Sequence, residues 1–440
     1  MPGTKVLNSA LLFFVISAAL MPTLLPNVSS VDRAVSGEVS TYECGTLYFF
    51  NGIAIFNSTL TQELMLETPY NITLRDGFEQ VVEHILSYNL VFNDTAKAFT
   101  FRAEANKSFE GFFISKVKIC SREMNSTLST LLFAYQYPTY LLSPGGEIPT
   151  EVIENYLREP SKKVIESLIP AYEKWFKSKY NIQPKNASQL GIASTASYFI
   201  YSVYLEYAAE ALPRTIDEVI DTRRGDCDDM SRVLVELLSY FGIPSVIVWG
   251  YVYIHSFNYT SPVENVTYKF INNGPHAFVM AYIAGMGWVS SDWLAGSLLT
   301  YPFIGEDYSR ETAVVNEAIV EFVELHKEIN ATQIFVVLDE EGSQKYIGSP
   351  ITTERLQSYF EHLLYGRDAE HYTSAPENLT NDNTSNGPGY YNTTTASNLT
   401  HQVNNIITLI EHWYIEIILI ALVVILVGII ILALIGRAIK

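Results

Sequence analysis

The sequence predicts an α+β fold in which helices pack on an antiparallel sheet. Short alternating apolar runs between Asn-rich turns fill residues 27–145, which indicates a β-rich extracellular domain. Helical periodicity follows within residues 146–366 and gives way there to strand-like runs rich in Val, Ile and Tyr. The length of 440 residues exceeds what a single core usually serves, so we expect two or three domains.

The composition excludes some classes of protein. Charged residues make up 17% of the chain, whereas a typical soluble domain has about 25%. The chain has 28 Lys and Arg against 47 Asp and Glu, a net charge of −19. Nucleic acid is therefore not an expected partner, because neutralising phosphates requires clustered cations. The low charge and the many neutral polar residues favour an extracellular protein.

The N-terminal residues 1–26 have the layout of a signal peptide or an N-terminal anchor. A single early cation, Lys5, precedes a mostly apolar run over Ala10–Met21, and the helix breakers Pro22 and Pro26 follow it. Either interpretation sends the following residues out of the cytosol.

The C-terminal residues 411–440 predict a transmembrane helix and a short cytoplasmic tail. Ile417–Ile435 is an unbroken apolar run, and at 1.5 Å per residue it would span about 30 Å of hydrocarbon. Arg437 and Lys440 supply a positive inner flank. We therefore expect a single-pass protein of the cell membrane whose body is extracellular and whose helix contacts the lipid bilayer.

Asparagine-rich segments support this orientation. Residues 367–410 are rich in Asn, Thr, Ser, Gly and Tyr without apolar periodicity, so they predict a glycosylated stalk. Sequons of the type N-x-S/T serve as glycosylation acceptors only on the translocated side. The candidates are Asn57, Asn71, Asn93, Asn106, Asn125, Asn186, Asn258, Asn265, Asn330, Asn378, Asn383, Asn392 and Asn398.

The β-rich region contains two clear strand patterns and one apparent helix. Thr46–Phe56 and Lys97–Phe101 have alternating or aromatic character and predict strands. Phe78–Tyr88 carries Val81, Val82, Ile85 and Leu86 at helical spacing and predicts a helix.

Three cysteines outside the cell allow one disulfide and leave one thiol. Cys44 and Cys120 lie in the same predicted domain, whereas Cys227 lies far away. The sequence therefore predicts a Cys44–Cys120 disulfide. Closing a loop of this size would stabilise the fold by about 4 kcal/mol in the chain-entropy model.

The elements of the second region follow in order. An apolar stripe from Val164 to Phe176 predicts a helix that Pro170 could kink, and a second helix is expected over Ala193–Ala211. Thr215 and Glu218 form a capping-box pattern, which predicts a short helix that ends near Arg224. An amphipathic helix is expected to begin at Cys227. Strands are expected over Ile243–Ile254 and Ala277–Ile283.

Cys227 is the candidate nucleophile. A thiol on the first turn of a helix meets the positive end of the helix dipole, which favours the thiolate. The neighbours Asp226, Asp228 and Asp229 oppose this effect, and Arg223 and Arg224 assist it. Local charge therefore does not decide the state of the thiol, and a basic partner is required.

His276 is the best candidate for that partner, because it begins a strand and its imidazole can take and return a proton. Asp292 ends the return strand and could hold the imidazole in the right tautomer. Side chains alternate across a strand. Asp292 can therefore share a face with His276 only if the turn between the two strands has an odd number of residues or a bulge intervenes.

Several spaced motifs resemble the transglutaminase-like superfamily: Gly225-Asp226-Cys227-Asp228-Asp229, Tyr240-Phe241-Gly242-Ile243-Pro244, Gly250-Tyr251, His276-Ala277-Phe278 and Gly287-Trp288 through Asp292. The resemblance extends over roughly Ser161 to Trp293 and shares the chain order Cys, His, Asp. It implies a papain-like arrangement in which a helix bearing the cysteine packs against a sheet bearing the histidine and the aspartate, with Cys227, His276 and Asp292 as a catalytic triad.

The sequence also departs from the animal cross-linking enzymes of this superfamily. Asp228 follows the nucleophile where those enzymes have Trp. In addition, no Trp occurs between Trp175 and Cys227 to act as the side-chain donor of the oxyanion hole, as one does in those enzymes. We therefore expect a thiol acyl-transfer enzyme that acts on peptide or glutamine amides of protein substrates, with hydrolysis at least as plausible as cross-linking. The alternative is an inert surface module that binds partners. The remaining histidines show no metal-ligand spacing, so neither a metal nor a cofactor is expected.

Overall fold

The computed structural model describes residues 42–74, 77–122, 124–140, 147–209, 212–293, 303–309 and 316–366, which all fall in one unit of the chain. The predicted signal segment (1–26), the predicted stalk (367–410) and the predicted transmembrane segment (411–440) lie outside these residues. None of the helices within the described ranges is long and apolar enough to cross a membrane.

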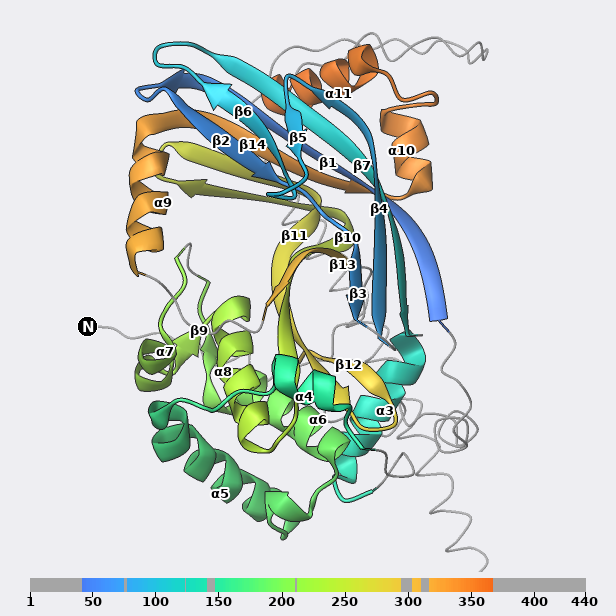
Figure 1. Ribbon diagram of the computed structural model, residues 1–440, viewed down its shortest axis with the longest axis vertical. Coiled ribbons are helices and arrows are strands. Elements are labelled where there is room, and N and C mark those ends of the chain that lie inside the picture. The colour runs from blue at the N-terminus through green and yellow to red at the C-terminus, as the bar shows by residue number, and fades with distance from the viewer. Residues whose placement is uncertain are drawn as a thin grey trace, which may run out of the picture. The chain divides into compact units, whose positions relative to one another are not determined.

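A nine-stranded mixed sheet forms the framework (Figure 1). Only β11 and β14 run parallel, and the other neighbouring strands of this sheet run antiparallel. In spatial order the strands are β13 (Phe303–Ser309), β10 (Ser245–Val263), β11 (Val266–Ile283), β14 (Ile329–Leu338), β1 (Tyr42–Ser58), β7 (Phe109–Arg122), β4 (Phe78–Tyr88) and β3 (Ile72–Leu74), and β12 (Gly287–Ser291) pairs with β11 beside this path. Strands from both predicted regions, 27–145 and 146–366, thus share one sheet.

Shorter strands and the helices complete the described structure. A three-stranded sheet has the order β2 (Gln62–Glu67), β6 (Ala98–Ala103), β5 (Val91–Asn93), and a parallel pair joins β8 (Glu206–Tyr207) to β9 (Arg224–Gly225). The helices are α3 (Met124–Gln136), α4 (Thr150–Tyr156), α5 (Ile169–Tyr180), α6 (Gln189–Phe199), α7 (Ile216–Thr222), α8 (Cys227–Tyr240), α9 (Asn316–Glu328), α10 (Glu340–Tyr346) and α11 (Thr353–Tyr365).

The predicted helix over Phe78–Tyr88 is wrong, because this segment is strand β4. A bulge between His84 and Leu86 interrupts its pairing with β7 and reverses which residues face which side. Val82 therefore packs against the core on one face of the sheet and Leu86 against the core on the other. The segment therefore consists of two short alternating patterns of opposite phase, and together they place its apolar residues at the spacing expected for a helix.

The predicted helices of the second region are present with shifted ends. The stripe that begins at Val164 starts as a π-helical turn and continues as α5, whose first turn contains Pro170. Pro170 has no N–H to donate, and it directly follows the π-helical turn, in which the Ile169 N–H bonds to the Val164 carbonyl five residues back. The helix expected over Ala193–Ala211 is α6, and it ends early in a second π-helical turn, Ile200–Tyr204.

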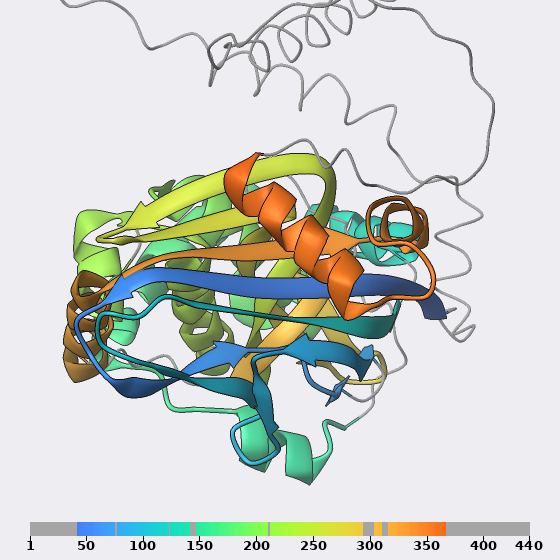
Figure 2. The same cartoon turned by 90° about the horizontal axis from the view of Figure 1, so that it is seen from above.

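Three hydrophobic clusters hold these layers together. One lies between the helices α3 and α5 to α8 and the β10–β12 end of the large sheet, and it contains Val233, Leu237 and Val279. A second lies between the large sheet and the three-stranded sheet. The third lies under α11, which crosses β1 and β14 on the opposite face of the large sheet (Figure 2) and buries Leu356, Tyr359 and Phe360.

The predicted disulfide is present. Cys44 of β1 and Cys120 of β7 are directly opposite in the strand pairing and are joined as a disulfide, while Cys227 is free. The bridge covalently links two neighbouring strands of the large sheet.

Candidate active site

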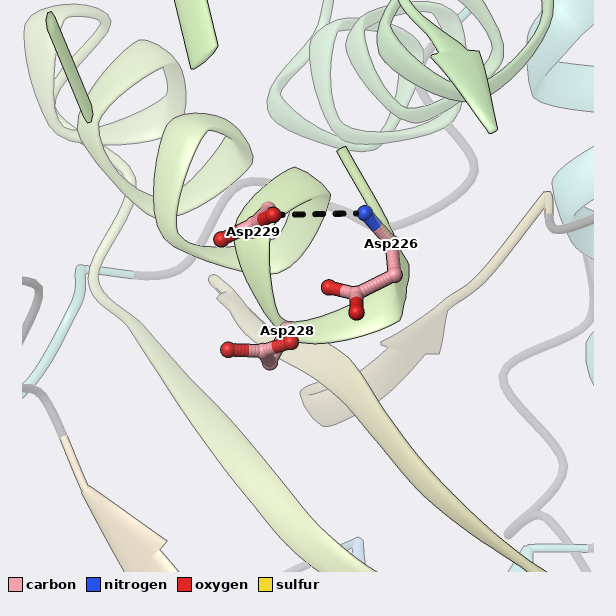
Figure 3. A group of neighbouring side chains, drawn as sticks. All are labelled: Asp226, Asp228 and Asp229. Atoms are coloured by element: carbon pink, nitrogen blue, oxygen red, sulfur yellow. Dashed lines mark hydrogen bonds between the residues drawn. The ribbon is translucent and has the colours of Figure 1, made fainter. Parts of the chain in front are cut away.

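Helix α8 begins at Cys227, as the sequence predicts, and presents the thiol on its first turn. Asp226 precedes the helix as its N-cap residue, and its backbone N–H donates to the Asp229 carboxylate at 3.4 Å (Figure 3). This bond satisfies one of the backbone donors at the start of the helix. The position of the sulfur is therefore fixed by the capping of α8.

The nucleophile lies against an interruption in strand pairing. Along one edge of β11, β14 pairs with Val266–Ile271 and β12 with Val279–Ile283. The stretch between them pairs with β10 along the other edge, but within the described part of the chain no strand pairs with it along this edge. Helix α8 packs against this edge of β11. The Ala277 N–H donates to the Cys227 sulfur, and the Ser231 hydroxyl lies 3.3 Å from the Ala277 carbonyl oxygen. The thiol is thus held beside the residue that follows His276.

His276 and Asp292 are brought together. Nε2 of His276 lies 2.8 Å from Oδ2 of Asp292, and the two residues are 7% and 2% exposed. An ionised carboxylate can only accept hydrogen bonds, so Nε2 carries the proton and donates it to Asp292. In the neutral imidazole with the proton on Nε2, Nδ1 carries the lone pair that a general base uses.

The register that joins these two residues satisfies the condition set by the sequence. Ile283 pairs directly with Gly287, so the turn between β11 and β12 contains an odd number of residues, three. Ser291 opposes Val279 and the next residue, Asp292, follows on the face of Phe278 and His276. Gly285, at φ +75°, adopts the left-handed backbone in this turn.

The thiol is protonated in the resting site. Burial, followed by the charge of Asp228, raises the pKa of Cys227 to about 12, although the hydrogen bond from the Ala277 N–H lowers it in part. The expected dipole effect is therefore outweighed by desolvation and the neighbouring carboxylates. Arg223, which the sequence suggested as an aid to the thiolate, instead places its guanidinium 3.5 Å from the centre of the Tyr204 ring.

The three aspartates around the nucleophile place carboxylate oxygens within 4.8 Å of one another (Figure 3). The charges of Asp228 and Asp229 are met by arginines. Asp229 is fully buried and pairs with Arg214 at 2.6 Å and with Arg232, and Arg232 also pairs with Asp228 at 2.8 Å. The cluster is thus better explained as an ionic anchor for the start of α8 than as a metal site.

This anchor extends to the strand before the nucleophile. Arg214 donates from its backbone to Asp229 at 3.0 Å, and its guanidinium lies 3.4 Å from the Ala208 carbonyl oxygen, next to β8. Gly225 of β9 permits the close approach, since a Cβ there would lie 2.8 Å from Cβ of Asp229.

The sequence did not identify Arg214, Arg232 or Ser231 as parts of this site. The pair of Asp229 and Arg232 has the i, i+3 spacing of a helical ion pair, so that contact had a local signal. Arg214 lies 15 residues before Asp229, outside the motif and in another element, and no pattern indicated it.

Comparisons with known proteins agree with the resemblance seen in the sequence. Residues 177–293 match the sequence model of the transglutaminase-like superfamily, and this range contains Cys227, His276 and Asp292. No curated protein sequence matches the chain. A solved structure described as "a Putative Cysteine Protease from Cytophaga hutchinsonii" is similar with a TM-score of 0.36 and 13% sequence identity, over 68% of this chain and 93% of that chain.

Proposed function

We propose that this protein is a cell-surface thiol enzyme that transfers acyl groups from peptide or glutamine amides through Cys227, His276 and Asp292. The observation that carries the proposal is the 2.8 Å contact between His276 and Asp292 beside the strand edge that binds the Cys227 sulfur. The order Cys, His, Asp within the region that matches the superfamily model supports the assignment.

Each of the three side chains has its own role in the proposed reaction. Nδ1 of His276 takes the thiol proton as the Cys227 sulfur attacks the carbonyl carbon, and the Asp292 carboxylate stabilises the resulting imidazolium through Nε2–H. When the C–N bond breaks, the imidazolium returns the proton to the leaving amine. Water or a second amine then attacks the thioester carbonyl carbon while His276 accepts its proton, and the C–S bond breaks as His276 returns this proton to the Cys227 sulfur. Water gives hydrolysis and an amine gives cross-linking.

The raised pKa of Cys227 favours this sequence of events over a preformed ion pair. A thiol with a pKa of about 12 is almost entirely protonated at neutral pH. Attack therefore requires removal of the proton in the same step, which is the role of a general base. The same raised pKa is also what the alternative function, an inert module that binds surface partners, would show.

The location outside the cell is part of the proposal. Every sequon asparagine whose side chain the structure describes is exposed, as a glycosylation acceptor must be: Asn57, Asn71, Asn93, Asn106, Asn186, Asn258, Asn265 and Asn330. The Cys44–Cys120 disulfide is typical of oxidising compartments. Both features fit an exported body held at the membrane by residues 411–440, with protein or peptide substrates at the cell surface.

Acylation by p-nitrophenyl acetate tests the proposed chemistry. The ester acylates a competent thiol and releases nitrophenol, whose absorbance measures the rate. We expect a burst of one equivalent in the wild type and none in Cys227→Ala. The pH profile of the burst should level off well below the pKa of Cys227, because a general base removes the thiol proton in the attacking step.

The matched control is His276→Gln, which removes the base but keeps the thiol. Its acylation rate should rise about tenfold per pH unit towards the pKa of Cys227, about 12, because only the thiolate then reacts. A wild-type profile that also rises without levelling off would contradict a general base and favour the binding module.

A further inference from the structure

The proposed reaction passes through a tetrahedral intermediate whose oxygen is negatively charged. Preorganised hydrogen-bond donors normally stabilise this oxyanion. The backbone N–H of Cys227 is one donor at the start of α8, where N–H groups have no intrahelical acceptor. A second donor has to come from a neighbouring element.

Two tyrosines lie close enough to Cys227 for its charge to affect them, Tyr201 and Tyr207. Tyr201 is buried, and its hydroxyl lies 2.9 Å from the hydroxyl oxygen of Ser231. Ser231 uses its single proton on the carbonyl oxygen of Cys227 at 2.7 Å. The Tyr201 hydroxyl must therefore donate to Ser231, so its proton is already engaged.

Tyr207 differs from Tyr201 in each of these respects. It lies on β8 directly opposite Gly225, two residues before the nucleophile, and it is 51% exposed. Among the described residues no hydrogen-bond partner engages its hydroxyl. The phenol is therefore accessible to a ligand that approaches from solvent.

The backbone around Tyr207 is held on both sides. Glu206 N–H donates to the Arg223 carbonyl at 2.8 Å, and Ala208 N–H donates to the Gly225 carbonyl at 2.9 Å. Arg214, which pairs with Asp229 on the first turn of α8, also contacts the Ala208 carbonyl. The ionic anchor thus ties Tyr207 and the nucleophile to the same framework.

We propose that the Tyr207 phenol is the second oxyanion donor and that it binds the carbonyl oxygen of the substrate's acyl group together with the Cys227 N–H. This inference rests on the proposed acyl-transfer function. It makes Tyr207 a catalytic residue, because its hydroxyl would touch a reacting atom.

The protonation of Tyr207 fits this role. Burial raises the pKa of Tyr207 to about 12 together with the charge that Cys227 carries as a thiolate and the charge of Asp226. The phenol therefore keeps its proton throughout the neutral range and can donate it in a hydrogen bond. A phenolate could not serve as a donor.

The test compares two reactions of the same thiol in the full-length protein. Acylation by p-nitrophenyl acetate develops an oxyanion, whereas alkylation by iodoacetamide displaces iodide without forming one. Tyr207→Phe removes only the hydroxyl. We expect it to slow acylation by about 10²–10³-fold, the usual effect of losing one such donor, and to leave the alkylation rate within about twofold.

Tyr259→Phe is the matched control, because Tyr259 is exposed and lies close enough to influence the pKa of Tyr207. It should leave both rates unchanged. Equal acylation rates in wild type and Tyr207→Phe would overturn the oxyanion role while leaving the proposed function intact. A parallel loss of acylation and alkylation would also overturn it, since that outcome means a structural effect. A wild type without any acylation burst would overturn both proposals.

Discussion

The first turn of α8 has two flanks, and each contains a buried carboxylate. On the flank that faces α7, Asp229 is fully buried and meets the guanidinium groups of Arg214 and Arg232. On the flank that faces β11, Asp292 is 2% exposed and meets the imidazole of His276. Both carboxylates avoid the cost of an isolated buried charge, but with different partners.

The difference shows how the partner decides what a buried carboxylate does. Arginine stays charged at any accessible pH, so its pairs with Asp229 are permanent and fix backbone positions. An imidazole gains and loses a proton near neutral pH, so its contact with Asp292 responds to that proton. We therefore call the Asp229 side the framework flank, because it fixes backbone positions, and the Asp292 side the chemical flank, because it takes part in the proposed reaction. Substitutions can separate the two roles.

The largest expected effect is on the chemical flank. Asp292→Asn keeps the size of the side chain, but its amide can stabilise the wrong imidazole tautomer. Acylation by p-nitrophenyl acetate should fall by up to about 10⁴-fold. The urea midpoint of unfolding should change little in the same sample. Full activity in Asp292→Asn would contradict the assignment of this residue to the chemistry.

On the framework flank we expect a loss of stability. Asp229→Ala leaves two guanidinium groups near the start of α8 without their shared carboxylate, and breaking a buried pair in this way costs about 3–5 kcal/mol. Urea unfolding followed by circular dichroism measures the change. The control is Asp221→Ala, whose ion pair with Lys163 is largely exposed and should contribute at most about 1 kcal/mol. Equal losses in the two variants would remove the distinction between the flanks.

The chemical flank was the easier one to predict from the sequence. Cys227 begins α8, as the sequence predicts. The expectation that His276 begins a strand is wrong, because β11 starts at Val266, but the alternation of side chains still gave the correct strand phase. The requirement for an odd turn followed from alternation, and the three-residue turn meets it. The Cys44–Cys120 bridge followed from counting cysteines within one region.

The framework flank and the sheet order depend on contacts that local patterns do not encode. Arg214 reaches Asp229 from before α7, and β14 (Ile329–Leu338) enters the sheet between β1 and β11 from far along the chain. The raised pKa of Cys227 could not be predicted from local sequence patterns either, because it depends on how deeply the thiol is buried. The bulge in β4 shows a further limit, because a change of phase within a strand imitates a helix.

The smallest expected effect lies where the two flanks meet, at Gly225. This residue is buried in β9, opposite Tyr207, and a Cβ there would lie 2.8 Å from Cβ of Asp229 and 3.3 Å from Val219. Cβ of Asp229 is fixed to the helix backbone, so the first turn of α8 has to shift. We expect Gly225→Ala to destabilise the fold by about 1–3 kcal/mol, as overpacking usually does.

The shift should reach the chemistry as well, because Gly225 lies between the anchor and the nucleophile. Acylation should fall more than alkylation, since a displaced Tyr207 and Cys227 N–H would no longer meet at one oxygen. The control is Gly242→Ala, which adds a methyl group to open space at a positive φ beyond the other end of α8. It strains the backbone without touching Asp229, so it should lower stability and leave the ratio of the two rates unchanged. If Gly225→Ala also left that ratio unchanged, the framework flank would stabilise the fold without positioning the reacting groups.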